Sequence, residues 1–202
     1  MKSSSLLWAA IAALPAAAAA ADRNDFNVDY YTVGGGTVEE LRNELNTLGP
    51  VGKSGAISEG NTYSRFEWRF DFDKKDGTCT VKEAFVDVTI RMTLPRWQRP
   101  DGVDQELVSH WNRYISALRM HEDGHRYLVE ATAREVRRVL AMKSSGPDCT
   151  TLRNQMNSKA RALVQELERK QADYDRETGN GRKQGVWLPE HLPEETDQDD
   201  GR

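Results

Sequence analysis

The chain has 202 residues, with 28 Lys and Arg against 32 Asp and Glu, and its net charge is −4. This length suits one domain, with or without tails. A mildly acidic chain without a basic cluster lacks the charge pattern of a nucleic-acid-binding protein, and a single long apolar stretch, at the N-terminus, excludes a protein with several membrane spans.

The first 21 residues have the layout of a secretory signal peptide. Lys2 precedes the apolar core Leu6–Leu14, which is too short to cross a bilayer, and the small-residue run Ala16–Ala21 follows. We expect cleavage after Ala21, which gives a secreted or periplasmic protein without stable membrane insertion. The alternative interpretation is an uncleaved membrane anchor.

The next part of the chain alternates between strand and short-helix patterns. Thr37 and Glu40 have the spacing of a capping box, and Asp76-Gly77 is a strong hairpin signal between two runs of alternating apolar residues. The predicted elements are a strand over 26–33, a helix over 38–48 and two antiparallel strands over 62–72 and 78–94.

Two long helices are predicted to follow, over 103–142 and 151–176, because their apolar residues recur at helical spacing. The break at Gly146-Pro147 is short, so the helices should be antiparallel neighbours. The expected fold is α+β, with a small antiparallel sheet packed on these helices in a zincin-like domain over 25–188. Residues 189–202 are acidic, with almost nothing apolar, and predict a disordered tail.

Export changes the interpretation of the two cysteines, Cys79 and Cys149. In an oxidising compartment an even pair favours one disulfide, and the alternative is two free thiols. Two cysteines alone cannot form a four-ligand structural zinc site.

Residues 121–125 read His-Glu-Asp-Gly-His, an HExxH arrangement inside a predicted helix. Four residues place His121 and His125 on one helix face, one turn apart, where two imidazoles can bind one Zn²⁺. Glu122 lies beside them and could act as the general base for attack by a zinc-activated water on a carbonyl. The histidines continue an apolar stripe, which predicts that both face inward. The motif therefore predicts a zinc-dependent peptidase.

A catalytic zinc usually has three protein ligands, and the third is not given by the spacing. If the two long helices pair about a turn near residue 146, His125 lies level with about Leu167 and His121 with about Gln171. The acidic residues near that level are Glu166, Glu168, Asp173 and Asp175. Geometry alone leaves them unranked. Tyr174 and Arg126 are candidates for stabilising an oxyanion.

The chain resembles a bacterial family of predicted secreted zinc-dependent proteases, a domain otherwise of unknown function that carries an HExGH motif. The resemblance rests on motifs that occur in order over almost the whole mature length. They are Tyr30-Tyr31, Leu48-Gly49-Pro50, the strand of Trp68, Leu94-Pro95-Arg96-Trp97, residues 121–125, both cysteines, 174–178 and Gln184-Gly185. The resemblance implies a secreted or periplasmic metalloprotease that acts on a peptide or protein substrate.

One position departs from the family pattern, which usually has a His-Gly pair after Tyr-Asp-x-x-Thr, where this chain has Asn180-Gly181. If that His binds the metal, this protein has lost a ligand; if Asp175 binds it, nothing is lost. We favour Asp175 as the third ligand, with Glu166 next. The alternative function is a non-catalytic binding domain of the cell envelope, with structural zinc or none.

Overall fold

The structure is a computed structural model that describes residues 22–52 and 55–192. The predicted signal peptide and the part of the predicted acidic tail beyond residue 192 lie outside the described residues. The elements in chain order are β1 (Asn24–Val33), α1 (Val38–Leu48), β2 (Asn61–Lys75), β3 (Thr78–Trp97), α2 (Gln105–Leu140), β4 (Ser145–Gly146), α3 (Cys149–Thr178) and the short 3-10 helix η1 (Arg182–Gln184).

The sheet has the strand order β1-β3-β2, with β4 paired to the start of β3. The predicted hairpin is confirmed: β2 and β3 are antiparallel, and Asp76 and Gly77 both have positive φ, as a tight hairpin turn requires. The α+β class is also confirmed, but the sheet is mixed, because β1 runs parallel to β3. The prediction of an antiparallel sheet was wrong for β1. Helix α1 and a long loop separate β1 from β2, so no hairpin turn forces β1 to run antiparallel.

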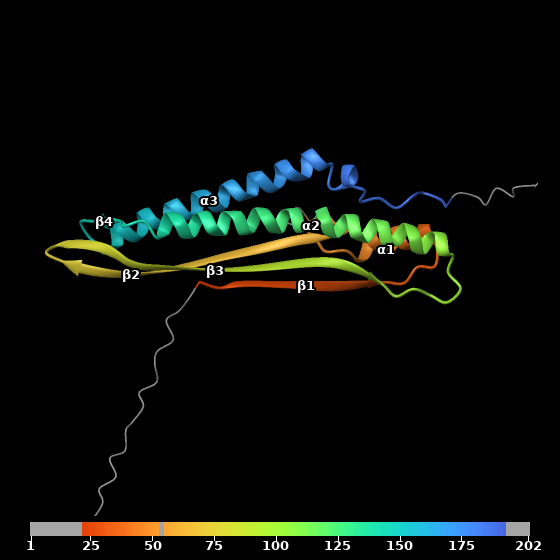
Figure 1. Cartoon of the computed structure of the whole chain (residues 1–202), viewed down its shortest axis with the longest axis horizontal. Helices are drawn as coiled ribbons and strands as arrows, with labels where there is room; N and C mark the ends of the chain where they lie inside the picture. The colour runs from red at the N-terminus through yellow and green to blue at the C-terminus, as the bar shows by residue number, and fades with distance from the viewer. Residues whose placement is uncertain (1–21, 53–54, 193–202) are drawn as a thin grey trace, which may run out of the picture.

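Helices α2 and α3 lie on the same side of the sheet; α3 runs back along α2 and moves away from the sheet toward its C-terminal end (Figure 1). The even-numbered residues Val86, Val88 and Ile90 of β3 are buried on that face. On the other face, Arg69 of β2 pairs with Asp87 of β3. The sheet is therefore covered on one side and ion-paired on the other. Within 22–52 and 55–192, no helix is long and apolar enough to span a membrane.

In the described part of the chain, the core consists of two clusters of buried side chains. The α1-end cluster joins α1 to the first half of α2 and the last half of β3, and it includes Leu41, Leu45, Leu94, Trp111 and Tyr114. The hairpin-end cluster joins α3 to the second half of α2 and the middle of β3, and it includes Val88, Val129, Val136, Leu152 and Met156. Both β3 and α2 run through the two clusters.

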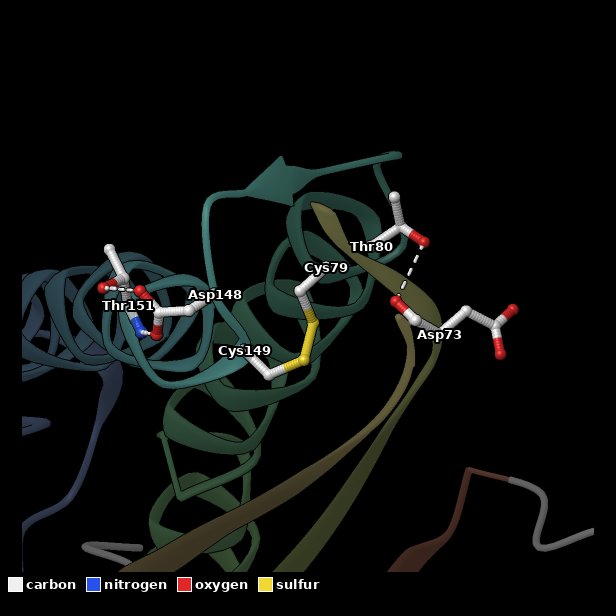
Figure 2. The surroundings of a disulfide bond; sticks show 6 residues. All are labelled: Asp73, Cys79, Thr80, Asp148, Cys149 and Thr151. Atoms are coloured by element: carbon white, nitrogen blue, oxygen red, sulfur yellow. Dashed lines mark hydrogen bonds between the residues drawn. A yellow bond between two sulfur atoms is a disulfide. The ribbon is translucent and has the colours of Figure 1, made fainter. Parts of the chain in front are cut away.

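The predicted disulfide is present between Cys79 of β3 and Cys149 at the start of α3. Figure 2 shows it beside β4 and the first turn of α3, where the Asp148 side chain accepts hydrogen bonds from the Thr151 backbone N–H and hydroxyl. This covalent link fixes the beginning of α3 to the sheet at the hairpin end of the molecule.

Candidate metal centre

The motif of α2 lies on the buried stripe of that helix, between Leu118 of the α1-end cluster and Val129 of the hairpin-end cluster. His121, Glu122 and His125 are only 4%, 4% and 7% exposed. The two imidazoles meet edge to face, with ring centroids 4.9 Å apart. The helix thus places three polar side chains together where its neighbours on the same stripe are apolar.

Asp175, near the end of α3, contacts both imidazoles. Its Oδ1 lies 2.9 Å from Nε2 of His125 and 3.4 Å from Nε2 of His121. Burial raises the pKa of this carboxyl, but the hydrogen bonds from the two imidazoles outweigh burial and hold the pKa well below its usual range. Burial lowers the pKa of His121, but the hydrogen bonds of its ring to Asp175 and Gln184 act in the opposite direction, and the net pKa is raised. The Asp175 carboxylate is therefore ionised, and its negative charge would attract a cation to this position beside the two imidazoles.

The three side chains could hold one metal ion. One donor atom from each of His121, His125 and Asp175 lies within 4.8 Å of the other two. Tetrahedral ligands at about 2.0–2.2 Å from one ion lie about 3.3–3.6 Å apart, close to the observed distances from Asp175. Two imidazoles and a carboxylate are also a donor set that zinc accepts while keeping a fourth position open. The residues present therefore fit a metal of this kind.

Glu122 faces the sheet rather than the carboxylate of Asp175. The Thr62 hydroxyl at the start of β2 lies 2.8 Å from its Oε2 and 3.1 Å from its backbone oxygen. Gly60 lets the loop before β2 approach, since a Cβ there would lie 3.0 Å from Oε1. Burial raises the pKa of Glu122, and the bond from Thr62 opposes that change. The carboxylate is thus held in place and is more basic than a solvated one.

A second side chain from the end of α3, Tyr174, packs between the helices at the motif. Its ring stacks on His121 and meets His125 edge-on, with centroid distances of 5.1 Å to each. Its hydroxyl donates to the backbone oxygen of His121 at 2.9 Å. Gly124 makes room for this contact, because a Cβ there would lie 2.1 Å from the hydroxyl oxygen. The glycine of the motif therefore has a packing role against α3.

Gln184, on η1, completes this set of contacts. Its Nε2 donates to the Tyr174 hydroxyl at 3.0 Å, and its Oε1 lies 2.8 Å from Nδ1 of His121. The 3-10 turn reaches this position because the chain reverses after α3 through left-handed residues at Gly179, Asn180 and Gly181.

The motif opens into a cleft of about 640 Å³, a size typical of ligand sites. His121, Glu122, His125 and Asp175 line it together with the loop before β2 and the segment after η1. Two apolar side chains in its lining, Ile57 and Trp187, are 44% and 53% exposed. The candidate metal ligands are thus reached from a cleft with both polar and apolar walls.

The other acidic candidates on α3 point elsewhere. Glu166 pairs with Arg169, and Asp173 pairs with Arg176. Asp175 lies further along α3 than the pairing about residue 146 predicts. Glu166 and Glu168 are absent from the described residues that line the cleft.

The remaining predicted residues have contacts of their own. Asn180 lines the cleft, exposed and in the left-handed region, and its backbone N–H donates to the Asp175 backbone oxygen at 2.7 Å. Arg126 pairs with Asp123 and Glu130. The Tyr174 hydroxyl is occupied by His121 and Gln184, as described above. Neither Arg126 nor Tyr174 belongs to the described cleft lining.

Sequence reasoning did not single out Thr62 or Gln184 for a role. Both come from outside α2, and no spacing rule connects either residue to residues 121–125. Gln184 did belong to a matching motif, Gln184-Gly185, and that motif was the one available signal for it.

Comparison with known proteins places the chain in a family but not in a function. No curated protein and no solved structure matches it. One family model matches over residues 28–182, which contain both helices of the candidate metal centre. The chain therefore belongs to the family described as a bacterial protein of unknown function (DUF922).

Proposed function

We propose that the protein is a zinc-dependent peptidase of the cell envelope, with a zincin-like arrangement of its motif helix and sheet. The observation that carries this proposal is the convergence of His121, His125 and Asp175 beside the buried carboxylate of Glu122 at a cleft. A zinc ion held by the three ligands would supply Lewis-acid polarisation of the peptide carbonyl and of the attacking water.

The roles of the chain's own groups follow from their positions. Glu122 is the general base: its carboxylate lies on the cleft next to both imidazoles, and its raised pKa suits proton abstraction from water. Thr62 orients that carboxylate through the bond to Oε2. Ile57 and Trp187 offer apolar surface to a substrate side chain.

The disulfide supports an exported protein, because such bonds persist in oxidising compartments. A secreted or periplasmic location is part of the proposal, together with removal of the predicted signal peptide.

Metal analysis of the purified mature protein tests the site. We expect about one zinc per chain, and loss of zinc in His121→Ala and in Asp175→Ala. Glu166→Ala is the matched control, because Glu166 lies on the same helix but pairs with Arg169, and it should retain zinc. Zinc retained by Asp175→Ala and lost by Glu166→Ala would reverse the choice of third ligand.

Hydrolysis of a broad peptide panel tests the activity. Glu122→Gln should keep zinc and lose at least about a hundredfold in rate, as expected for removal of a general base. Glu130→Gln, on the same helix but paired with Arg126, should cleave like the wild type. Hydrolysis that persists in Glu122→Gln would contradict the role of Glu122 as the general base. A folded, zinc-loaded wild type that cleaves nothing would favour the non-catalytic binding domain.

A further inference from the structure

The bonds around His121 have a fixed direction, because one partner can act in only one way. The His121 backbone oxygen is an acceptor only, so the Tyr174 hydroxyl must donate its single proton to this hydrogen bond. The phenolic oxygen can then only accept a bond from Gln184. The amide group of Gln184 must present its NH₂ to Tyr174, which turns its carbonyl oxygen toward His121.

These three hydrogen bonds form a relay from the His121 backbone oxygen through Tyr174 and Gln184 to the His121 ring. The last of them determines which nitrogen of the imidazole carries the proton. A carbonyl oxygen requires a donor, so Nδ1 of His121 must carry a proton. We propose that Tyr174 and Gln184 are positioning residues that hold His121 in the tautomer protonated at Nδ1, leaving Nε2 as its metal-binding atom. This inference rests on the metal site of the proposed function and adds the two residues that set its donor atom.

In this tautomer the surroundings of Nε2 call for a cation. Nε2 faces Oδ1 of Asp175 at 3.4 Å, so a lone pair and a carboxylate oxygen meet where a cation would bind. His125 differs, because its Nδ1 is buried and has no hydrogen-bond partner in the described part of the chain. The relay therefore acts on one of the two imidazoles. Gly124 supports the same relay, because the absence of a Cβ there leaves room for the Tyr174 hydroxyl.

Nitrogen NMR of the histidine side chains in the metal-free protein tests the tautomer directly. In its neutral form, the wild-type His121 should carry its single proton on Nδ1. Gln184→Leu and Tyr174→Phe should shift His121 toward a mixture of tautomers and leave His125 unchanged. A wild-type His121 protonated at Nε2, or a Gln184→Leu spectrum identical to that of the wild type, overturns the proposal.

Zinc affinity gives the second readout. Removal of a hydrogen-bond partner behind a metal ligand typically weakens binding about 10- to 100-fold, and we expect this for Gln184→Leu. Gln184→Glu keeps an acceptor for Nδ1 and should bind zinc within a few-fold of the wild type. Gln171→Leu is the matched control: Gln171 also lines the cleft on α3, and its loss should leave affinity unchanged.

The outcomes separate this inference from the proposed function. Equal weakening in Gln184→Leu and Gln184→Glu would reduce Gln184 to a packing role and overturn the inference. A protein with the expected tautomer and the expected affinities that cleaves no peptide overturns the peptidase proposal and leaves the inference standing.

Discussion

Thr62 is the residue through which the sheet reaches the buried carboxylate of Glu122. Its hydroxyl lies 2.8 Å from Oε2, and leaving a buried polar group without its partner costs about 1–3 kcal/mol. We predict that Thr62→Val lowers the free energy of unfolding by about this amount and slows hydrolysis, while zinc content stays at about one per chain. Urea unfolding and metal analysis of the same preparation measure both effects.

Thr89→Val provides the matched control for that substitution. Thr89 lies on β3 with its side chain on the solvent side of the sheet, and such positions usually tolerate substitution within about 0.5 kcal/mol. If the two variants unfold at the same urea concentration, the bond from Thr62 contributes nothing to stability and its proposed orienting role is lost.

The residues of the candidate site divide by how far the sequence could predict them. His121 and His125 followed from spacing alone, because residues one turn apart share a helix face whatever the tertiary structure is. Glu122 followed from its place in the same motif. Asp175 was one of four acidic candidates on the second helix, and only the packed helices bring it to both imidazoles. Thr62 and Gln184 arrive from other elements, so no local rule points to them.

At the scale of elements, local signals predicted the helices, the strands and the hairpin well, and pairing between distant elements less well. The β-forming residues of 26–33 predicted a strand there, but they do not tell which strand lies beside it. The parallel pairing of β1 with β3 therefore appeared only in the structure. The position of α3 along α2 was predicted only approximately for a similar reason, since helical periodicity does not tell which residues of two helices lie level with each other.

The disulfide fixes α3 at the end of that helix away from the candidate metal centre. It closes a loop of 70 residues, for which chain entropy gives a stabilisation of about 4 kcal/mol. About 39 Å of helix separates Cys149 from Asp175 at 1.5 Å per residue. We predict that the Cys79→Ala, Cys149→Ala double variant loses about 2–5 kcal/mol of stability in urea and keeps its zinc affinity. A parallel loss of zinc affinity would contradict this separation.

At the scale of the whole molecule, a hydrophobic content of only 38% still forms two buried clusters. The polar centre on α2 lies between them, with Leu118 on one side and Val129 on the other. Because β3 and α2 pass through both clusters, neither cluster can lose its packing without freeing an element that the other needs. The molecule should therefore unfold as one cooperative unit, although its core is divided.

Core substitutions in each cluster test this cooperativity. Leu45→Ala in the α1-end cluster and Met156→Ala in the hairpin-end cluster should each cost about 2–5 kcal/mol. Each should shift the urea transitions seen by tryptophan fluorescence and by far-UV circular dichroism together. Zinc at a hundred times its Kd should raise the stability of the wild type by about 2.7 kcal/mol, again with both probes. A variant whose urea transition shifts for only one of the two probes would show that the two clusters unfold separately. Zinc would then stabilise only the cluster whose transition it shifts.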